Sequence, residues 1–507
     1  MYDKKEENMD RINEETTIYE EFLQQAVKLF VEKQQLPIQE LHIGTQRNGT
    51  LFTIFGKLDD NYKVSKVDTF EDDFVDFVLS QTWEVDISRG FKNAELTIGD
   101  FNTWVGFHGS VDLQYIIEDT EKAKLRGTKK PEDVIYILQR LNDAGYSAYV
   151  VGGCVRDASM KRDPHDWDIT TSATPDQVEK VFEDHKIIET GLKHGTVTVM
   201  RNGEGYEITT YRIDGDYSDG RHPDKVSFTG DVVEDLKRRD FTMNAIALDN
   251  NGDVVDPFDG CADIYNRTVR AVGSPEDRFN EDALRIMRAI RFAAVFDFEI
   301  DGETKAAIFK LYPKLEAVSK ERINAELLKI ANSNHFFSSL AEYAEVFAFI
   351  MGIDSFNIKQ SLDREDYITK LAYMFISVSD AEQVMNDLKF DGDTRDKVIE
   401  LVKWKPYHLS QIDRVELKIW LNRIGAEQLY RLGKIHGYDL TSAINNLKDE
   451  CYTIKDLAVN GNDIMALGYK GKDVGKVLTE TLKAVIEETI PNDKTEIIKF
   501  IQGLNIQ

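Results

Sequence analysis

The stretch VVGGCVRDASMKRDPHDWDI, residues Val150–Ile169, decides the fold of the region around it. Its apolar start, glycine pair, short polar-apolar segment and second apolar segment predict a strand, a turn, a helix and another strand. In an extended strand, residues two apart share a face, so Asp166 and Asp168 should point the same way. Trp167 and Ile169 should then point into the core.

Two carboxylates on one rim can hold Mg²⁺, which prefers oxygen ligands and completes its shell with water and substrate phosphates. A nucleotidyl transfer needs such a site, because metal ions bridge a triphosphate and a hydroxyl nucleophile and neutralise the leaving pyrophosphate. The pair Gly152–Gly153 lets backbone N–H groups approach phosphate at a helix start. A DxD pattern alone is a common solvated strand end, and a glycine pair alone is weaker still. The combination, in this order and spacing, is specific.

The pattern further along the chain predicts an α+β protein: a small mixed α/β head, followed by a long all-helical neck, body and tail, with an extra N-terminal α/β region. The α/β pattern runs from Ala148 to about Asp259 and includes expected strands near Thr196–Met200 and Tyr206–Arg212. After about Arg270 the apolar positions recur with a helical period in Ala283–Phe296, Arg322–Ala331, Tyr367–Phe375, Val415–Asn422 and Val474–Glu487.

The N-terminal part, residues 1–127, carries no motif that assigns a role. We expect a helix at Ile18–Lys33 and strands at Leu51–Phe55 and Trp83–Ile87. Pro131 suits the first position of a helix that runs to about Ala144. The expected domains are the N-terminal extension at 1–127, the head at 128–267, the neck at 268–331, the body at 332–425 and the tail at 426–507.

A chain of 507 residues is too long for a single hydrophobic core. Its net charge of -27 is unfavourable for a protein that binds nucleic acid. A local basic face decides such binding, however, and basic clusters occur at Lys237-Arg238-Arg239, at Arg285, Arg288 and Arg291, and at Tyr469–Lys472. We therefore expect RNA binding that weakens steeply as the salt concentration rises.

The three cysteines are widely separated and lack a CxxC spacing, which argues against a disulfide framework and a zinc site. The first residues, MYDKKEENMDRINEE, lack the apolar core of a secretory signal. Apolar runs such as Val346–Met351 are far shorter than the roughly 20 residues that a membrane span needs. These features favour a soluble, cytoplasmic protein.

Six motifs, taken in order, resemble those of class II (bacterial-type) CCA-adding enzymes, the tRNA nucleotidyltransferases of the poly(A) polymerase-like nucleotidyltransferase family. They are GGCVRD at Gly152–Asp157, DWD at Asp166–Asp168, RRDFTMNAIA at Arg238–Ala247, DPFDG at Asp256–Gly260, EDALRIMRAIRF at Glu281–Phe292 and SKERINAE at Ser319–Glu326. The resemblance extends to the tail segment Ile464–Leu478 and does not cover residues 1–127.

The resemblance implies roles for individual residues. Asp166 and Asp168 would be catalytic and hold the metal, Mg²⁺, while Gly153 and Arg156 would face the triphosphate. Arg239 and Asp240 would contact the sugar of the nucleotide. The head would be the nucleotidyltransferase domain, the neck would select the nucleotide, and the tail would bind tRNA. An isolated pair such as Arg238-Arg239 would be interpreted as a solvated helix end. Because the pair stands before FTMNAIA, the resemblance favours contact with the nucleotide instead.

The segment Glu281–Phe292 can also be read from its chemistry. Asp282 and Arg285, three apart, should be neighbours on one helix face, and Arg288 and Arg291 continue the row toward phosphate. Cytosine and adenine both offer an amino donor beside a ring-nitrogen acceptor, so an Asp–Arg pair could accept them and reject uracil and guanine. The family is credited with this use of side chains in place of a template. The alternative is an ordinary surface salt bridge.

Three functions remain open at this point: CCA addition to tRNA from CTP and ATP, poly(A) polymerase activity, and RNA binding without catalysis. Both aspartates are present, which disfavours the third. The segment Thr209–Phe228 resembles the flexible loop of full CCA-adding enzymes, and a poly(A) polymerase would carry more basic sequence around its core. We therefore expect CCA addition. Trp404, Trp420, Tyr430 and Tyr469 could stack on RNA, although core packing is the expectation for most of them.

Overall fold

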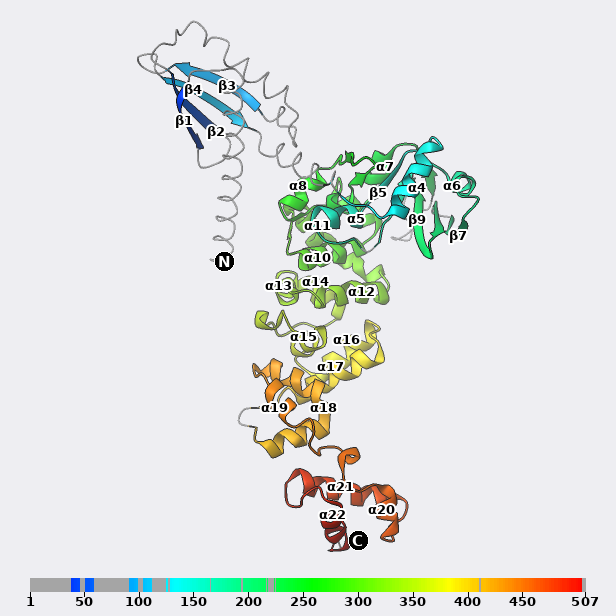
Figure 1. Cartoon of the computed structure of the whole chain (residues 1–507), viewed down its shortest axis with the longest axis vertical. Helices are drawn as coiled ribbons and strands as arrows, with labels where there is room; N and C mark the ends of the chain where they lie inside the picture. The colour runs from blue at the N-terminus through cyan, green and yellow to red at the C-terminus, as the bar shows by residue number, and fades with distance from the viewer. Residues whose placement is uncertain are drawn as a thin grey trace. The chain divides into compact units, whose positions relative to one another are not determined.

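The architecture is described from a computed structural model of the whole chain (Figure 1). It describes the backbones of strands 38–45, 51–58, 91–98 and 104–111, residue 125, and residues 128–503 apart from 165, 193–194, 216, 218–222, 224 and 410–411. The chain forms two compact units, which divide between Pro275 and Glu276.

The head in the first unit is built on a seven-stranded sheet of order β13-β12-β5-β6-β9-β8-β7. β5 is antiparallel to β6 and β12, β6 is parallel to β9, and β8 is antiparallel to β7 and β9. The strands are β5 (Ala148–Val151), β6 (Ile169–Thr171), β7 (Lys186–Gly191), β8 (Thr196–Arg201), β9 (Glu204–Thr210), β12 (Ala247–Leu248) and β13 (Val254–Val255). The expected strands at Thr196–Met200 and Tyr206–Arg212 are confirmed, with β9 ending at Thr210.

Short helices accompany this sheet. α4 (Glu132–Asp143) follows Pro131, as predicted, and buries Val134, Ile137, Leu138 and Leu141 along one side. The others are α5 (Gly153–Ser159), α6 (Pro175–Val181), α7 (Val232–Lys237) and α8 (Gly260–Tyr265), with the 3₁₀ turn η5 (Thr242–Asn244). A two-stranded sheet of β10 (Arg212–Asp214) and β11 (Val226–Phe228) lies within the predicted flexible loop, much of which falls outside the described residues.

The N-terminal strands form a separate antiparallel sheet of order β1-β2-β4-β3 (Figure 1). These strands are β1 (Ile38–Thr45), β2 (Leu51–Leu58), β3 (Phe91–Ile98) and β4 (Trp104–Val111). The expected strand Leu51–Phe55 falls within β2. The expected helix Ile18–Lys33 and strand Trp83–Ile87 lie outside the described residues.

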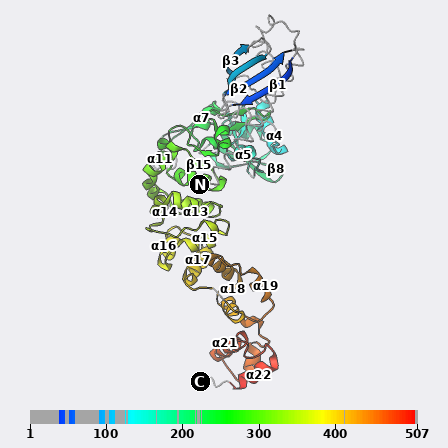
Figure 2. The ribbon, with the colours of Figure 1, turned by 90° about the vertical axis from the view of Figure 1, so that its left-hand side faces the viewer.

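The second unit is built almost entirely of helices (Figures 1 and 2). Each of the five predicted helical segments corresponds to a helix of this unit, although Ala283, Phe375 and Glu487 lie one residue outside the helices α10, α15 and α21. The predicted fold class is confirmed. The α-helices are α9 (Pro275–Glu281), α10 (Leu284–Phe296), α11 (Gly302–Leu311), α12 (Lys320–Ala331), α13 (Phe336–Glu342), α14 (Ala344–Met351), α15 (Tyr367–Met374), α16 (Val378–Asp387), α17 (Gly392–Trp404), α18 (Arg414–His436), α19 (Thr441–Asn446), α20 (Gly461–Ala466), α21 (Lys472–Ile486) and α22 (Lys494–Gly503). The long α18 is broken at Gly425, which has a φ of 76°.

Lysine side chains join successive helices of this unit. Lys370 Nζ on α15 donates hydrogen bonds to the carbonyl oxygens of Ala331 (2.9 Å) and Ser333 (2.6 Å), at the end of α12. Lys405, just after α17, donates in the same way to Tyr373 (3.2 Å) and to Phe375 at the end of α15. A cation at a helix C-terminus satisfies carbonyl groups that have no partner within the helix. Burial nevertheless lowers the pKa of Lys405 to about 8.

Candidate active site

Asp166 and Asp168 lie directly before β6, and both side chains are exposed, whereas Trp167 is half-buried and Ile169 is buried. The prediction that both aspartates lie within the strand is therefore wrong, although their exposure alternates as the prediction required. Val151 N donates to Asp168 O at 3.0 Å, and the partner strand β5 ends there. Because Gly152 then turns the chain with a φ of 79°, the ladder stops at Asp168.

The carboxyl group of Asp168 lies in a mixed electrostatic environment. Although the residue as a whole is exposed, protein atoms around the carboxyl group desolvate it and raise its pKa above the usual range. The nearby Arg239 partly offsets this rise, and the carboxylate of Asp166 adds to it. Two neighbouring carboxylates repel each other when both are ionised, and a bound cation relieves that repulsion. The charge distribution thus suits a cation at Asp166 and Asp168.

Among the described residues, no group of three or more histidine, cysteine, aspartate or glutamate side chains is arranged to hold a metal ion. A cation at Asp166 and Asp168 could take further ligands from water and from substrate phosphates. Mg²⁺ is commonly bound in this way, through one or two carboxylates and a triphosphate.

The glycine pair faces two arginines of the predicted site. A Cβ atom built at Gly152 would lie 2.9 Å from Nη1 of Arg239, and one at Gly153 would lie 3.7 Å from Nη2 of Arg156. Gly152 also has the positive φ that other residues rarely adopt. Glycine at 152 therefore serves two purposes: it makes the turn, and it leaves room for the guanidinium group of Arg239.

Arg156 and Asp240, predicted from separate motifs, meet through a third residue, Asn244. Arg156 Nη1 donates to Asn244 Oδ1 at 2.7 Å, and Asn244 Nδ2 donates to Asp240 Oδ1 at 3.0 Å. Arg156 also donates through Nε and Nη2 to Asp157 Oδ1, at 2.9 and 2.7 Å. Asp240 and Asn244 are buried. Asn244 is part of the RRDFTMNAIA motif, yet no spacing rule in the sequence indicated that it would join these two residues.

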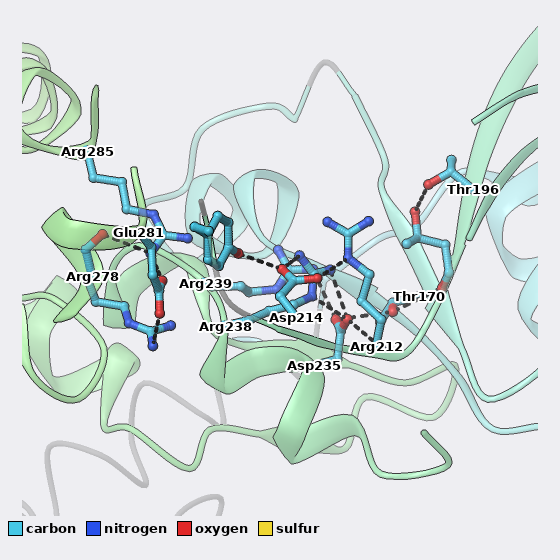
Figure 3. Close-up of polar contacts among 12 residues, drawn as sticks. Thr170, Thr196, Arg212, Asp214, Asp235, Arg238, Arg239, Arg278, Glu281 and Arg285 are labelled. Atoms are coloured by element: carbon cyan, nitrogen blue, oxygen red, sulfur yellow. Dashed lines mark hydrogen bonds and ion pairs between the residues drawn. The ribbon is translucent and has the colours of Figure 1, made fainter. Parts of the chain in front are cut away.

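The residue that the sequence reading missed is Asp235, whose side chain is fully buried among arginines (Figure 3). Its carboxylate accepts hydrogen bonds from Arg238 Nε (3.0 Å), Arg212 N (3.3 Å) and, more weakly, Thr170 Oγ1 (3.4 Å). Arg239 Nη2 lies 3.5 Å from its other oxygen. The spacings of three and four residues from Asp235 to the two arginines, on and just after α7, were the signal that could have found it.

Arg239 is thus held between Asp235 and the turn at Gly152, with 19% of its side chain exposed. Burial lowers its pKa, and the Asp235 carboxylate partly offsets that effect. Guanidinium groups stay protonated in proteins, so Arg239 remains a fixed positive charge near Asp168.

The DPFDG motif has a structural explanation. Both carboxylate oxygens of Asp256 accept backbone N–H groups at the start of α8, from Gly260 at 2.8 Å and from Cys261 at 2.9 Å. A Cβ atom at Gly260 would lie only 2.2 Å from the carbonyl oxygen of Thr242. The motif therefore lets α8 pack directly against η5, the turn that carries Asn244.

Asp282 begins the set of predicted nucleotide-selecting residues in the second unit. The prediction that it shares a continuous helix face with Arg285 is wrong, because α9 ends at Glu281 and α10 begins at Leu284. Asp282 Oδ1 instead accepts from Leu284 N at 3.0 Å, and Asp282 Oδ2 accepts from Arg322 Nη2 at 2.7 Å. Asp282 caps the start of α10 and pairs with α12.

Arg285 pairs with a different carboxylate. Its Nη1 donates to Glu281 Oε2 at 2.6 Å and to the carbonyl oxygen of Arg278 at 3.2 Å (Figure 3). Glu281 also pairs with Arg278 Nη2 at 2.5 Å. The alternative reading, a surface salt bridge between Asp282 and Arg285, is wrong, because the structure has two separate pairs, Asp282–Arg322 and Arg285–Glu281.

The remaining arginines of the row lie along α10. The guanidinium carbon of Arg288 lies 5.4 Å from the ring centroid of Phe292, and that of Arg291 lies 3.8 Å from the same ring. Arg291 Nε also pairs with Glu326 of α12, whose side chain is 6% exposed. Arg291 thus helps to join α10 to α12 within the second unit.

Comparison with known proteins places these residues in a family context. The model of the poly(A) polymerase head domain matches residues 148–270, which span the aspartates, Asp235 and the DPFDG motif. The model of domain 2 of tRNA nucleotidyltransferases matches residues 360–501, and a model of an RNA-binding segment of polymerase A matches residues 297–346.

The match between this chain and its curated relatives, and one solved structure, spans nearly the whole length of those proteins. The chain is 36% identical over 394 residues to the CCA-adding enzyme of Streptococcus suis, covering 74% of this chain and 96% of that one. It is 33% identical over 384 residues to the CCA-adding enzyme of Enterococcus faecalis, covering 72% and 94%. The crystal structure of the Bacillus stearothermophilus CCA-adding enzyme in complex with CTP matches with a TM-score of 0.61 and 30% identity, covering 74% and 98%.

Proposed function

The chain belongs to the family of CCA-adding enzymes, and from that premise we propose that Asp166 and Asp168 hold Mg²⁺ at its active site. As a member of this family it is a tRNA nucleotidyltransferase, which adds C, C and A to the 3' end of tRNA from CTP and ATP without a nucleic-acid template. The observation that carries this activity is the nearly full-length match to curated CCA-adding enzymes. The poly(A) polymerase alternative is not favoured.

Enzymes of this family depend on a divalent cation. The neighbouring exposed residues Asp166 and Asp168, whose carboxylates repel each other when both are ionised, support its binding there, and the oxygen donors favour Mg²⁺ as the ion. When bound, such a cation neutralises charge on the triphosphate and on the leaving pyrophosphate. The 3'-hydroxyl oxygen of tRNA forms the new bond to the α-phosphorus as the bond to pyrophosphate breaks.

The side chains of the head would bind and orient the nucleotide. Arg156, beside Gly153, would contact the triphosphate, and its bonds to Asn244 and Asp157 would fix the direction of its guanidinium group. Arg239 and Asp240 would contact the sugar. Asp235 is a positioning residue in this proposal, because it touches Arg238 and Arg239 rather than the reacting atoms.

The choice of nucleotide is proposed to depend on Asp282 and Arg285. The oxygens of Asp282 each accept a hydrogen bond within the protein, yet a carboxylate oxygen has two lone pairs, so Asp282 can still accept from the amino group of C or A. Arg285 would donate to the ring nitrogen, and Arg288 and Arg291 would lie toward the phosphates. The fixed pairs with Arg322 and Glu281 would make this arrangement rigid, which favours selectivity.

The protein is proposed to act in the cytoplasm. All three of its cysteines, Cys154, Cys261 and Cys451, are free and buried, as suits a reducing compartment. In the part of the chain that the structure describes, no helix is long and apolar enough to cross a membrane.

The test of the activity uses a tRNA transcript that lacks its three terminal nucleotides. With CTP and ATP together, the product should be longer by three nucleotides, and with CTP alone by two. With ATP alone, a long tail would indicate a poly(A) polymerase and would contradict the proposed function. The same assay with a chelator, and then with Mg²⁺ or Mn²⁺ restored, identifies the ion.

A further inference from the structure

Three aromatic rings gather where α17 ends and α18 begins. The ring centroids of Trp404 and Trp420 lie 5.4 Å apart at an interplanar angle of 90°, and Tyr407 lies 5.2 Å from Trp404 and 6.1 Å from Trp420. The two tryptophans are half-buried, and 54% of Tyr407 is exposed. The rings thus pack against one another and also reach the surface.

Two cations lie over these rings. The guanidinium carbon of Arg423 is 4.9 Å from the ring centroid of Trp404 and 5.1 Å from that of Trp420, while Lys403 Nζ is 5.1 Å from Trp404. Both residues are exposed. Among the described residues, neither has a carboxylate within ion-pair distance, which is notable in a protein of net charge -27. We call Trp404, Tyr407, Trp420, Arg423 and Lys403 the body platform.

An open hollow of about 680 Å³ adjoins the body platform. Trp404, Lys403 and Arg423 line it together with residues of α16 and α17. Two of its acidic residues have partners within the protein: Asp396 pairs with Arg395 at 3.0 Å, and Glu400 accepts from Gln428 Nε2 at 3.1 Å. Of these two carboxylates, only Asp396 has a cationic partner, because Gln428 is a neutral amide. The lining also includes Glu382, and Lys403 and Arg423 face it as cations that contact the tryptophan rings.

We propose that the body platform binds an unpaired, unstacked base of the tRNA substrate, with Tyr407 and the Arg423 guanidinium group as stacking surfaces. The inference rests on the proposed function, because it takes tRNA as the ligand. A nucleobase stacks on aromatic rings and on guanidinium planes, whereas a regular RNA duplex presents phosphates and a shallow groove that need no aromatic side chains.

The arrangement of Arg423 favours RNA over a purely apolar ligand. The guanidinium carbon of Arg423 lies about 5 Å from both indole centroids, and a guanidinium group has five N–H donors, so Arg423 can face a base and also contact the adjoining phosphate. Lys403 offers a second cation at the same edge. The hollow is large enough for one nucleotide, and Asn386 on its wall provides an amide that can hydrogen-bond a base edge.

The test uses the full chain with Tyr407→Ala and Arg423→Gln, two exposed positions whose replacement should leave the fold intact, as a thermal melt would verify. The probe is a tRNA transcript lacking its terminal CCA, titrated at one fixed salt concentration. Each variant should raise the Kd for this tRNA by about tenfold, since one stacked base corresponds to roughly 5- to 100-fold in affinity. The KM for CTP should not change.

Lys397→Gln is the matched control for Arg423→Gln, because it too removes one positive charge, here from α17, where Lys397 pairs with Asp393 at 2.7 Å. It should change the Kd for tRNA by less than twofold. Tryptophan fluorescence provides a second measurement: saturating tRNA should quench it, and Trp404→Phe should remove part of that quenching.

A Kd within twofold of the wild-type value for both Tyr407→Ala and Arg423→Gln would overturn the inference, whatever else this surface binds. Failure of the proposed function would look different, since the wild-type protein would then add no nucleotide to the tRNA, or a long A tail in place of C, C and A.

Discussion

Arg239 packs its guanidinium group against the turn at Gly152, where a Cβ atom would lie 2.9 Å from Nη1. This contact joins the glycine motif to the RRDFTMNAIA motif. On its other side, Arg239 faces Asp235, and its charge offsets part of the rise in the pKa of Asp168 that desolvation causes. One arginine thus connects the turn, the buried carboxylate and the proposed metal-binding aspartate.

Asp235→Asn keeps the size of the side chain and removes the charge that faces Arg238 and Arg239. Loss of one partner of a buried ion pair is strongly destabilising, by about 3–5 kcal/mol where both groups are buried, and by less here because each arginine is partly exposed. We expect kcat/KM for CTP to fall more than tenfold and the melting temperature to fall by several degrees, with the Kd for tRNA within twofold.

Glu234→Gln is the control for this variant, since Glu234 lies on the same helix but faces Lys237 at 3.6 Å on the surface. It should behave as the wild type does. An Asp235→Asn protein with a lower melting temperature but an unchanged kcat/KM for CTP would restrict Asp235 to a role in stability.

Asp168→Ala should abolish nucleotide addition while tRNA binding and the thermal melt stay close to those of the wild type. The carboxylate is exposed and would act in the chemical step, so its removal leaves the core intact. Asp163→Ala, at another exposed aspartate of the same segment, should retain activity. Substantial turnover by Asp168→Ala in saturating Mg²⁺ would remove Asp168 from the metal site.

Asp282→Ala should lower the preference for CTP and ATP over UTP. A lost hydrogen bond to a charged group is worth roughly 1.5–3 kcal/mol, so discrimination should fall by about one to two powers of ten. Single-nucleotide incorporation of the four triphosphates measures it. Arg322→Gln tests the alternative that Asp282 acts only through its ion pair, because this variant removes the pair and leaves the carboxylate in place. If the carboxylate selects the base, Arg322→Gln should keep most of the selectivity. Equal selectivity in Asp282→Ala and the wild type would refute the selection role.

Gly260→Ala should destabilise the head. The added methyl group would lie 2.2 Å from Thr242 O, so backbone must move, and overpacking of this kind costs typically about 1–3 kcal/mol. Gly475→Ala is the matched change in α21, where a Cβ atom meets nothing within 4 Å. It should stabilise by about 0.5–1 kcal/mol. Urea unfolding followed by circular dichroism compares the two, and a stable Gly260→Ala protein would contradict the packing role of the DPFDG motif.

Much of the fold could be predicted because its signals are local. A helical period of apolar residues predicts a helix from neighbouring residues alone, as in Ala283–Phe296 and Val474–Glu487, where α10 and α21 form. The proline at 131 likewise marks the start of α4. The strand assignment of Asp166 and Asp168 was wrong because strand length depends on the partner. β5 ends at Val151, so the residues before Ile169 have no partner strand to pair with, and β6 begins at Ile169.

The sequence by itself determined the fold class, the order of motifs and, through them, the family to which the chain belongs. Only the tertiary structure decided which charged groups meet. Arg156 reaches Asn244 across 88 residues, Asp282 pairs with Arg322 instead of Arg285, and Asp235 gathers Arg212, Arg238 and Arg239. The physical reason is that a short-range motif specifies residue types, whereas a charge inside a protein pairs with whatever partner the packing of distant elements brings within hydrogen-bond distance.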